Sequence, residues 1–110
     1  MIFSKTGNIT VITQERATIV ELVANIDKKY DQIKGDNIIV NLFSVKDIQD
    51  NAINDFLSVS KKHKASKKSF VLVNDKIDID NAPEDLSIVP TLQEAHDIIE
   101  MEEIERDLDF

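Results

Sequence analysis

The sequence contains no cysteine, which excludes a disulfide framework, thiolate metal ligands and thiol catalysis. The absence fits a reducing compartment, so we expect a cytoplasmic protein. Glycine is scarce, with 2 residues in 110, and a glycine-rich loop that cradles phosphate is therefore not expected. Residues Met1–Lys5 lack the apolar core of a signal peptide, and no apolar run approaches the thickness of a bilayer. We expect neither export by a signal peptide nor a membrane partner.

Basic residues are also in the minority. The chain has 13 lysines and arginines against 21 acidic residues, a net charge of −8. The electric field of a protein with this negative net charge repels nucleic acid and anionic membranes. One basic cluster stands out, made of Lys61, Lys62, His63, Lys64, Lys67 and Lys68. It has no interleaved aromatic residues for base stacking, and it fits the solvated C-terminal end of a helix. We predict no nucleic-acid binding and favour a protein partner with a basic surface.

What the chain does contain is a regular succession of apolar segments. Short runs predict strands at residues 1–5, 8–13, 38–43, 70–73 and 86–89. Apolar residues three and four apart predict helices that begin near Gln14, Ala52 and Leu92. Gly7 marks a hairpin turn between the first two strands, and Gly35 marks the end of the first helix. The order predicts a single α/β domain over residues 1–110, with a mixed, mainly parallel sheet of about five strands and three to four helices.

The last helix is strongly acidic. Thr91 and Glu94 form a capping box at its start. We expect one apolar face, made by Leu92, Ala95, Ile98, Ile99, Met101, Ile104 and Leu108. Residues 100–110 form an acidic helix end or tail, in which negative charge opposes the helix dipole. This end is either a solvated outer face or a surface that docks on a basic partner or on the lysine cluster of a second copy.

No constellation typical of catalysis or metal binding stands out. The acidic run from Asp75 to Asp85 lacks the spacing and the glycine of a calcium loop. His63 and His96 have no ligand partner four residues on, so we interpret both as surface histidines. No Ser-His-Asp or paired-carboxylate arrangement rises above the background of acids. We therefore predict a protein that is not an enzyme, with no metal and no cofactor.

The segment Ile39–Ile53, together with the order of elements and the chain length, resembles the STAS domain of bacterial anti-sigma-factor antagonists. In that family a strand of the type V-D-L is followed by a turn and by D-S-S-G-L at the start of a helix. A partner kinase phosphorylates the first serine of that motif. The resemblance covers most of the chain and implies a bacterial regulatory domain that binds other proteins.

The motif itself is degenerate in this sequence. Asn41 takes the place of the strand aspartate, and Gln49 takes that of the motif aspartate. Asp50 replaces the phosphorylatable serine, Asn51 the second serine and Ala52 the glycine. The resemblance therefore implies a binding surface without its phosphorylation switch.

A carboxylate at Asp50 carries a fixed negative charge and has no hydroxyl to modify. It has about one charge and two oxygens, against nearly two charges and three oxygens for a phosphate, so it mimics phosphoserine only in part. The alternative is that Asp50, or equally Asp47, simply caps a helix and stabilises it by about 0.5–2 kcal/mol. Ser44 lies in the preceding turn and is only a weak candidate modification site.

These observations predict a non-enzymatic interaction module that resembles an anti-sigma-factor antagonist. The predicted partner-binding residues are Asp47, Gln49, Asp50, Asn51, Asn54 and Asp55. The partner has a basic surface, and an anti-sigma-factor-like kinase is one candidate. The alternative is a small accessory or structural subunit that oligomerises, for example as a homodimer, through its acidic last helix.

Overall fold

The chain folds around a five-stranded sheet whose spatial order is the order of the sequence, β1-β2-β3-β4-β5. A computed structural model describes residues 2–13, 19–42, 52–77, 80 and 82–108. The strands are β1 (Ile2–Thr6), β2 (Ile9–Thr13), β3 (Asn37–Asn41), β4 (Phe70–Val73) and β5 (Ser87–Val89). β1 pairs antiparallel with β2, and the other neighbours pair in parallel. The predicted mixed, mainly parallel sheet is confirmed.

The antiparallel pair is a hairpin. Its turn contains Gly7 at φ +60°, a conformation that a residue without Cβ adopts without strain. Thr6 pairs with Ile9 across the turn, and the register runs on to the pair of Ile2 and Thr13. Gly7 therefore marks the hairpin turn that the sequence predicts.

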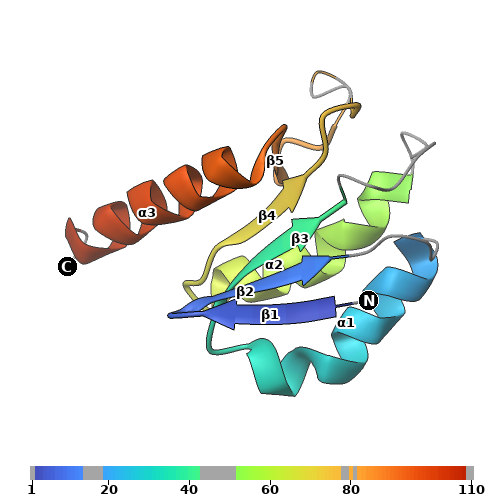
Figure 1. Ribbon diagram of the computed structural model, residues 1–110, viewed down its shortest axis with the longest axis horizontal. Coiled ribbons are helices and arrows are strands. Elements are labelled where there is room, and N and C mark those ends of the chain that lie inside the picture. The colour runs from blue at the N-terminus through green and yellow to red at the C-terminus, as the bar shows by residue number, and fades with distance from the viewer. Residues whose placement is uncertain (1, 14–18, 43–51, 78–79, 81, 109–110) are drawn as a thin grey trace.

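Helices cover both faces of the sheet (Figure 1). They are α1 (Ile19–Ile33), α2 (Leu57–Ala65), which follows the 3-10 helix η1 (Ala52–Phe56), and α3 (Leu92–Leu108). Side chains alternate between the faces along each strand. In β3, Ile38 and Val40 pack with α1 and α2, whereas Ile39 packs with α3. All three are fully buried, as a central strand covered on both sides requires.

The apolar face of α1 follows the predicted helical spacing. Its buried residues are Ile19, Leu22, Ile26, Tyr30 and Ile33. They join the larger core cluster with Phe56 and Val59 of the following helical segment. A helix with one apolar stripe packs this way against a sheet because the stripe is withdrawn from water as a unit.

The predicted apolar face of α3 is wrong in part. Thr91 Oγ1 accepts the Glu94 N–H at 3.2 Å, so the cap is confirmed. Of the seven predicted residues, however, only two are buried, Ala95 and Ile99. Met101, Ile104 and Leu108 are 56%, 54% and 78% exposed. The later turns of α3 reach past the amino ends of the strands, where the sheet no longer lies beneath them (Figure 1).

Within the described part of the chain, no helix has the length and apolar character needed to cross a membrane.

Candidate functional site

The carboxyl-edge surface is the name we give to the predicted partner-binding residues Asp47, Gln49, Asp50, Asn51, Asn54 and Asp55. Of these, the structure describes Asn54 and Asp55. The other four, and Ser44, lie outside the described residues.

Asn54 and Asp55 lie on η1, near the carboxyl end of β3 (Figure 1). Both side chains are exposed, whereas Ile53 and Phe56 on either side of them are buried at 1% and 0% exposure. The buried pair belongs to the core that α1 shares. The short helix therefore presents an amide and a carboxylate to solvent from a firmly packed base.

Asn74 fixes the carboxyl edge of the sheet from the next strand. Its Nδ2 donates to the Leu42 carbonyl at 2.9 Å, and its Oδ1 accepts the N–H groups of Lys76 and Ile77 at 2.8 and 3.1 Å. The Asn74 N–H donates to the Val89 carbonyl at 3.0 Å. Asn74 is 2% exposed and joins the ends of β3, β4 and β5. Sequence reasoning missed it, although an Asn directly after an apolar strand is typical of a local side-chain turn.

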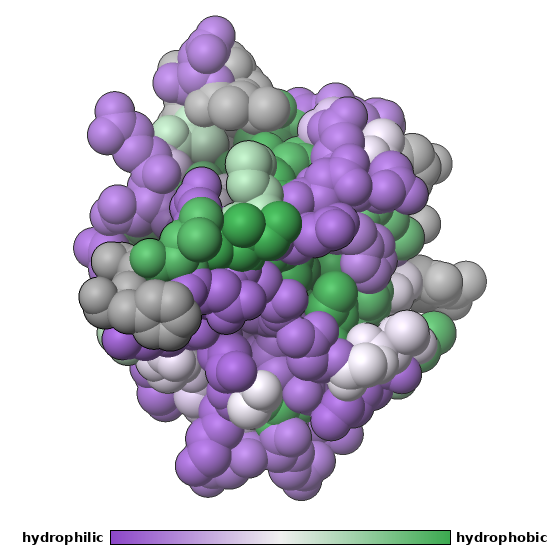
Figure 2. All heavy atoms as spheres, turned by 90° about the vertical axis from the view of Figure 1, so that its left-hand side faces the viewer, coloured by the Kyte–Doolittle hydropathy of each residue, from purple (hydrophilic) through white to green (hydrophobic). Residues whose placement is uncertain are grey.

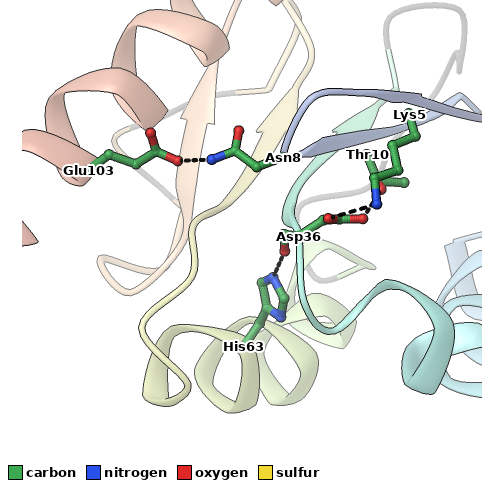
Figure 3. A network of polar contacts seen from close by, with 6 residues as sticks. All are labelled: Lys5, Asn8, Thr10, Asp36, His63 and Glu103. Carbon is green, nitrogen blue, oxygen red and sulfur yellow. Dashed lines mark hydrogen bonds and ion pairs between the residues drawn. The ribbon is translucent and has the colours of Figure 1, made fainter.

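At the opposite, amino edge of the sheet, His63 is completely buried, so its interpretation as a surface histidine is wrong. Its Nε2 lies 2.7 Å from the Asp36 carbonyl oxygen and its Nδ1 lies 2.8 Å from the Tyr30 hydroxyl (Figure 3 shows the contact with Asp36). A carbonyl oxygen can only accept, so Nε2 carries the proton and Nδ1 accepts from Tyr30. One neutral tautomer thus satisfies both partners.

Burial lowers the pKa of His63 below its ordinary value of 6.5 because desolvation disfavours the imidazolium. The hydrogen bond to the Asp36 carbonyl opposes this shift, the charge of Lys68 reinforces it and the charge of the Asp36 carboxylate opposes it. The ring also contacts Tyr30 and Phe70 edge-on, with centroids 5.5 and 6.3 Å apart. His63 therefore acts as a neutral core residue.

The Asp36 carboxylate extends this arrangement to the hairpin. Its Oδ2 accepts from the Thr10 hydroxyl at 2.9 Å, and its Oδ1 lies 3.3 Å from Lys5 Nζ (Figure 3). The Asp36 side chain is only 12% exposed, whereas that of Lys5 is 62% exposed. A residue between α1 and β3 is thereby tied to both β1 and β2.

A polar clasp holds the second half of α3 to the same edge. Glu103 Oε1 accepts from Asn8 Nδ2 and Asn37 Nδ2, both at 2.6 Å (Figure 3 shows the contact with Asn8). Arg106 donates to Ser69 Oγ at 3.2 Å and to Asn37 Oδ1 at 3.4 Å. Polar contacts thus anchor the turns of α3 whose apolar side chains point away from the sheet.

One sequence signal could have found His63, but none could have found the clasp. His63 follows Phe56 by seven residues and Ser60 by three, which places it on the buried stripe of the helix. The lysines around it suggested a solvated face instead. Asn37 and Glu103 are 66 residues apart, so no local periodicity relates them.

Among the residues that the structure describes, no group of three or more His, Asp or Glu side chains is placed to hold a metal ion. The buried side chains of Asp36, Asn37 and His63 at the amino edge are engaged with other side chains and with main-chain atoms, an arrangement that orders the fold. At the carboxyl edge, the side chains of Asn54 and Asp55 are exposed to solvent.

Solved proteins of similar structure include the following two. A serine-to-glutamate variant of RsbS from Moorella thermoacetica matches with a TM-score of 0.66 at 12% identity, over 90% of this chain and 93% of that chain. The NMR structure of the protein TM1081 matches with a TM-score of 0.69 at 19% identity, over 89% of this chain and 86% of that chain. No protein-family model and no curated protein sequence matches. The likeness establishes the fold, and the STAS-like fold that the sequence predicts is confirmed.

The buried His63 should make the fold sensitive to mild acid. Its pKa is lower in the folded than in the unfolded chain, so the unfolded chain binds the proton first as the pH falls below about 6.5. His63 then lowers the free energy of unfolding by up to about 1.4 kcal/mol per pH unit until the folded-state pKa is reached. Urea unfolding of the wild type and of His63→Gln from pH 7.5 to 5 measures this, with half-buried His96→Gln as the control. The slope should be shallower in His63→Gln alone; equal slopes in all three proteins contradict the assignment.

Asn74 should contribute strongly to stability. Asn74→Ala leaves the Leu42 carbonyl and two main-chain N–H groups without their partner, so we expect a loss of about 2–3 kcal/mol. The exposed Asn54→Ala is the matched control, with an expected change within about 0.5 kcal/mol. Urea unfolding measures both, and similar small effects would show that Asn74 does not fix the edge.

Proposed function

We propose that this chain is a non-enzymatic, STAS-like regulatory module of the bacterial cytoplasm that binds a protein partner through its carboxyl-edge surface. The exposure of Asn54 and Asp55 on η1 is the observation that carries this proposal. This helix start follows the third strand, and the STAS resemblance implies that partners bind there. The fold shared with RsbS supports the assignment.

Charge indicates the kind of partner. The predicted binding residues include three aspartates, Asp47, Asp50 and Asp55, in a chain whose net charge is already −8. Such a surface attracts a basic partner and speeds its association. We propose an anti-sigma-factor-like kinase as the partner. Because Asp50 has no hydroxyl, phosphorylation at that position does not release the complex.

Charge reversal on the carboxyl-edge surface tests this function. A partner captured from the native lysate is identified, purified and titrated calorimetrically with Asp50→Lys/Asn51→Lys and with Asn54→Lys/Asp55→Lys. Each double variant places cations against the basic partner, so we expect affinity to fall by about tenfold or more.

The matched control is Gln93→Lys/Asp97→Lys on α3, where both side chains are exposed. In all three variants one carboxylate and one amide become ammonium groups, so the change in net charge is the same. The control should bind like the wild type. Unchanged affinity in both carboxyl-edge variants would refute the proposed binding surface. Equal losses of affinity in all three variants would show that only the net charge of the chain matters.

A second candidate function is an accessory subunit that oligomerises through α3. The exposed Met101, Ile104 and Leu108 follow one another at helical spacing and favour it. Figure 2 shows apolar atoms in a band bordered by hydrophilic atoms on this side of the molecule.

Light scattering separates the two functions. The accessory-subunit candidate predicts a wild-type oligomer that dissociates in Ile104→Gln/Leu108→Gln, because these side chains lose apolar contact area on substitution. Leu92→Gln, exposed at the first turn of the same helix, is the control and should leave the oligomer intact. A monomeric wild type at high concentration contradicts this candidate.

A further inference from the structure

Two adjoining hollows lie between the turn after α2 and the last turns of α3. Their volumes are about 320 and 290 Å³, and both are lined by Lys67, Lys68 and Arg106. Lys64 lines the first and the buried Asn37 lines the second. We call this region the amino-edge hollow. It lies at the opposite end of the strands from Asn54 and Asp55.

The four cations of the amino-edge hollow have no ion-pair partner among the described residues. The ion pairs found among the described residues join Lys5 with Asp36, Lys34 with Asp31 and Lys61 with Asp85, and none of them includes a cation of the amino-edge hollow. Lys64 Nζ donates to the Asp85 carbonyl at 2.6 Å, and Arg106 donates to uncharged oxygens. In a chain with a net charge of −8, four cations gather around one region without forming an ion pair in the described part of the chain, so their mutual repulsion is only partly offset by the acidic residues nearby.

Lys67 adds a second, independent observation. It adopts φ +64° just after α2, where its N–H donates to the Lys64 carbonyl at 3.0 Å and the Lys68 N–H donates to the His63 carbonyl at 3.4 Å. This is the helix ending in which glycine is the usual residue, because a Cβ is strained in the left-handed conformation. Backbone stability alone favours glycine. A lysine here keeps a cation on the wall of both hollows.

We propose that the amino-edge hollow binds a small phosphate-bearing anion through Lys64, Lys67, Lys68 and Arg106. The guanidinium still has donors beyond those used for Ser69 and Asn37, and its planar fork suits phosphate oxygens. The lysines supply compact charges around it.

Acidic side chains limit the ligand. Glu102, Glu103 and Asp107 also line the hollows, and Glu103 is already held by two amides. These carboxylates repel a long polyanion such as nucleic acid, whereas a ligand with one phosphate or diphosphate group can sit among the cations. The site therefore suits a small molecule and acts independently of the protein partner proposed above.

Pyrophosphate provides the first test, with no protein partner present. Thermal unfolding and calorimetric titration compare pyrophosphate with sodium chloride at equal ionic strength. An anion that binds only the folded chain raises Tm, so the wild type should respond to pyrophosphate beyond the response to chloride. Citrate, a carboxylate anion of similar charge, should bind more weakly than pyrophosphate. No response beyond chloride, or tighter binding of citrate, overturns the proposal.

Lys67→Gly gives the sharper test because strain and binding predict opposite effects. Without anion it should raise Tm by a few degrees, since glycine removes the strain. It should also weaken pyrophosphate binding several-fold, and Lys67→Gly/Lys68→Gln about tenfold or more. Lys28→Gln, an exposed charge removal on α1, is the control and should bind like the wild type. Undiminished binding in the double variant, or an equal loss in Lys28→Gln, overturns the site.

Discussion

The fold depends on two hydrogen bonds made by a completely buried histidine. His63 accepts from the Tyr30 hydroxyl of α1 and donates to the Asp36 carbonyl just before β3, so α2 is locked to both. Burying a polar group costs free energy unless the group is hydrogen-bonded, and here one neutral tautomer gives both ring nitrogens a hydrogen-bond partner. The same residue, Asp36, then holds Thr10 and Lys5 of the hairpin. His63 and Asp36 thus connect α1, α2, β1 and β2.

The two edges of the sheet consequently differ in character. At the amino edge, side chains bind other parts of the chain, and the clasp of Glu103 and Arg106 adds the last helix to them. At the carboxyl edge, Asn74 fixes the strand ends, and Asn54 and Asp55 on η1 are exposed. A rigid scaffold with exposed residues beyond its strand ends is a common arrangement for recognition in α/β folds. The proposed anion site lies at the amino edge and consists of the cations there that form no ion pair with a described residue: Lys64, Lys67, Lys68 and Arg106.

The sequence predicts the parts of this fold that depend on local periodicity. The apolar run Ile38–Val40 within β3, the stripe of α1 and the cap at Thr91 are each visible within a few residues, and the structure has them. His63 was missed because the buried stripe of α2 contains two polar residues, Ser60 and His63, and the lysines beside them are typical of a solvated face. The exposure of Ile104 and Leu108 depends on how far α3 runs past the sheet, which no local pattern encodes. Of the predicted partner-binding residues, Asn54 and Asp55 are exposed in the structure, and Asp47, Gln49, Asp50 and Asn51 lie outside the described residues. The binding role of all six stays a prediction.

In the folded chain, His63 is a neutral core residue held by Asp36 and Tyr30. Two-bond proton–nitrogen NMR correlations of the histidine rings test it most directly, because they distinguish the tautomers and follow the charge. We expect His63 to be in the Nε2–H form, its Nε2 proton to exchange slowly with water, and the ring to stay neutral below the ordinary pKa of about 6.5. An Nδ1–H tautomer, or protonation of His63 in the folded chain at its ordinary pKa, would contradict the account.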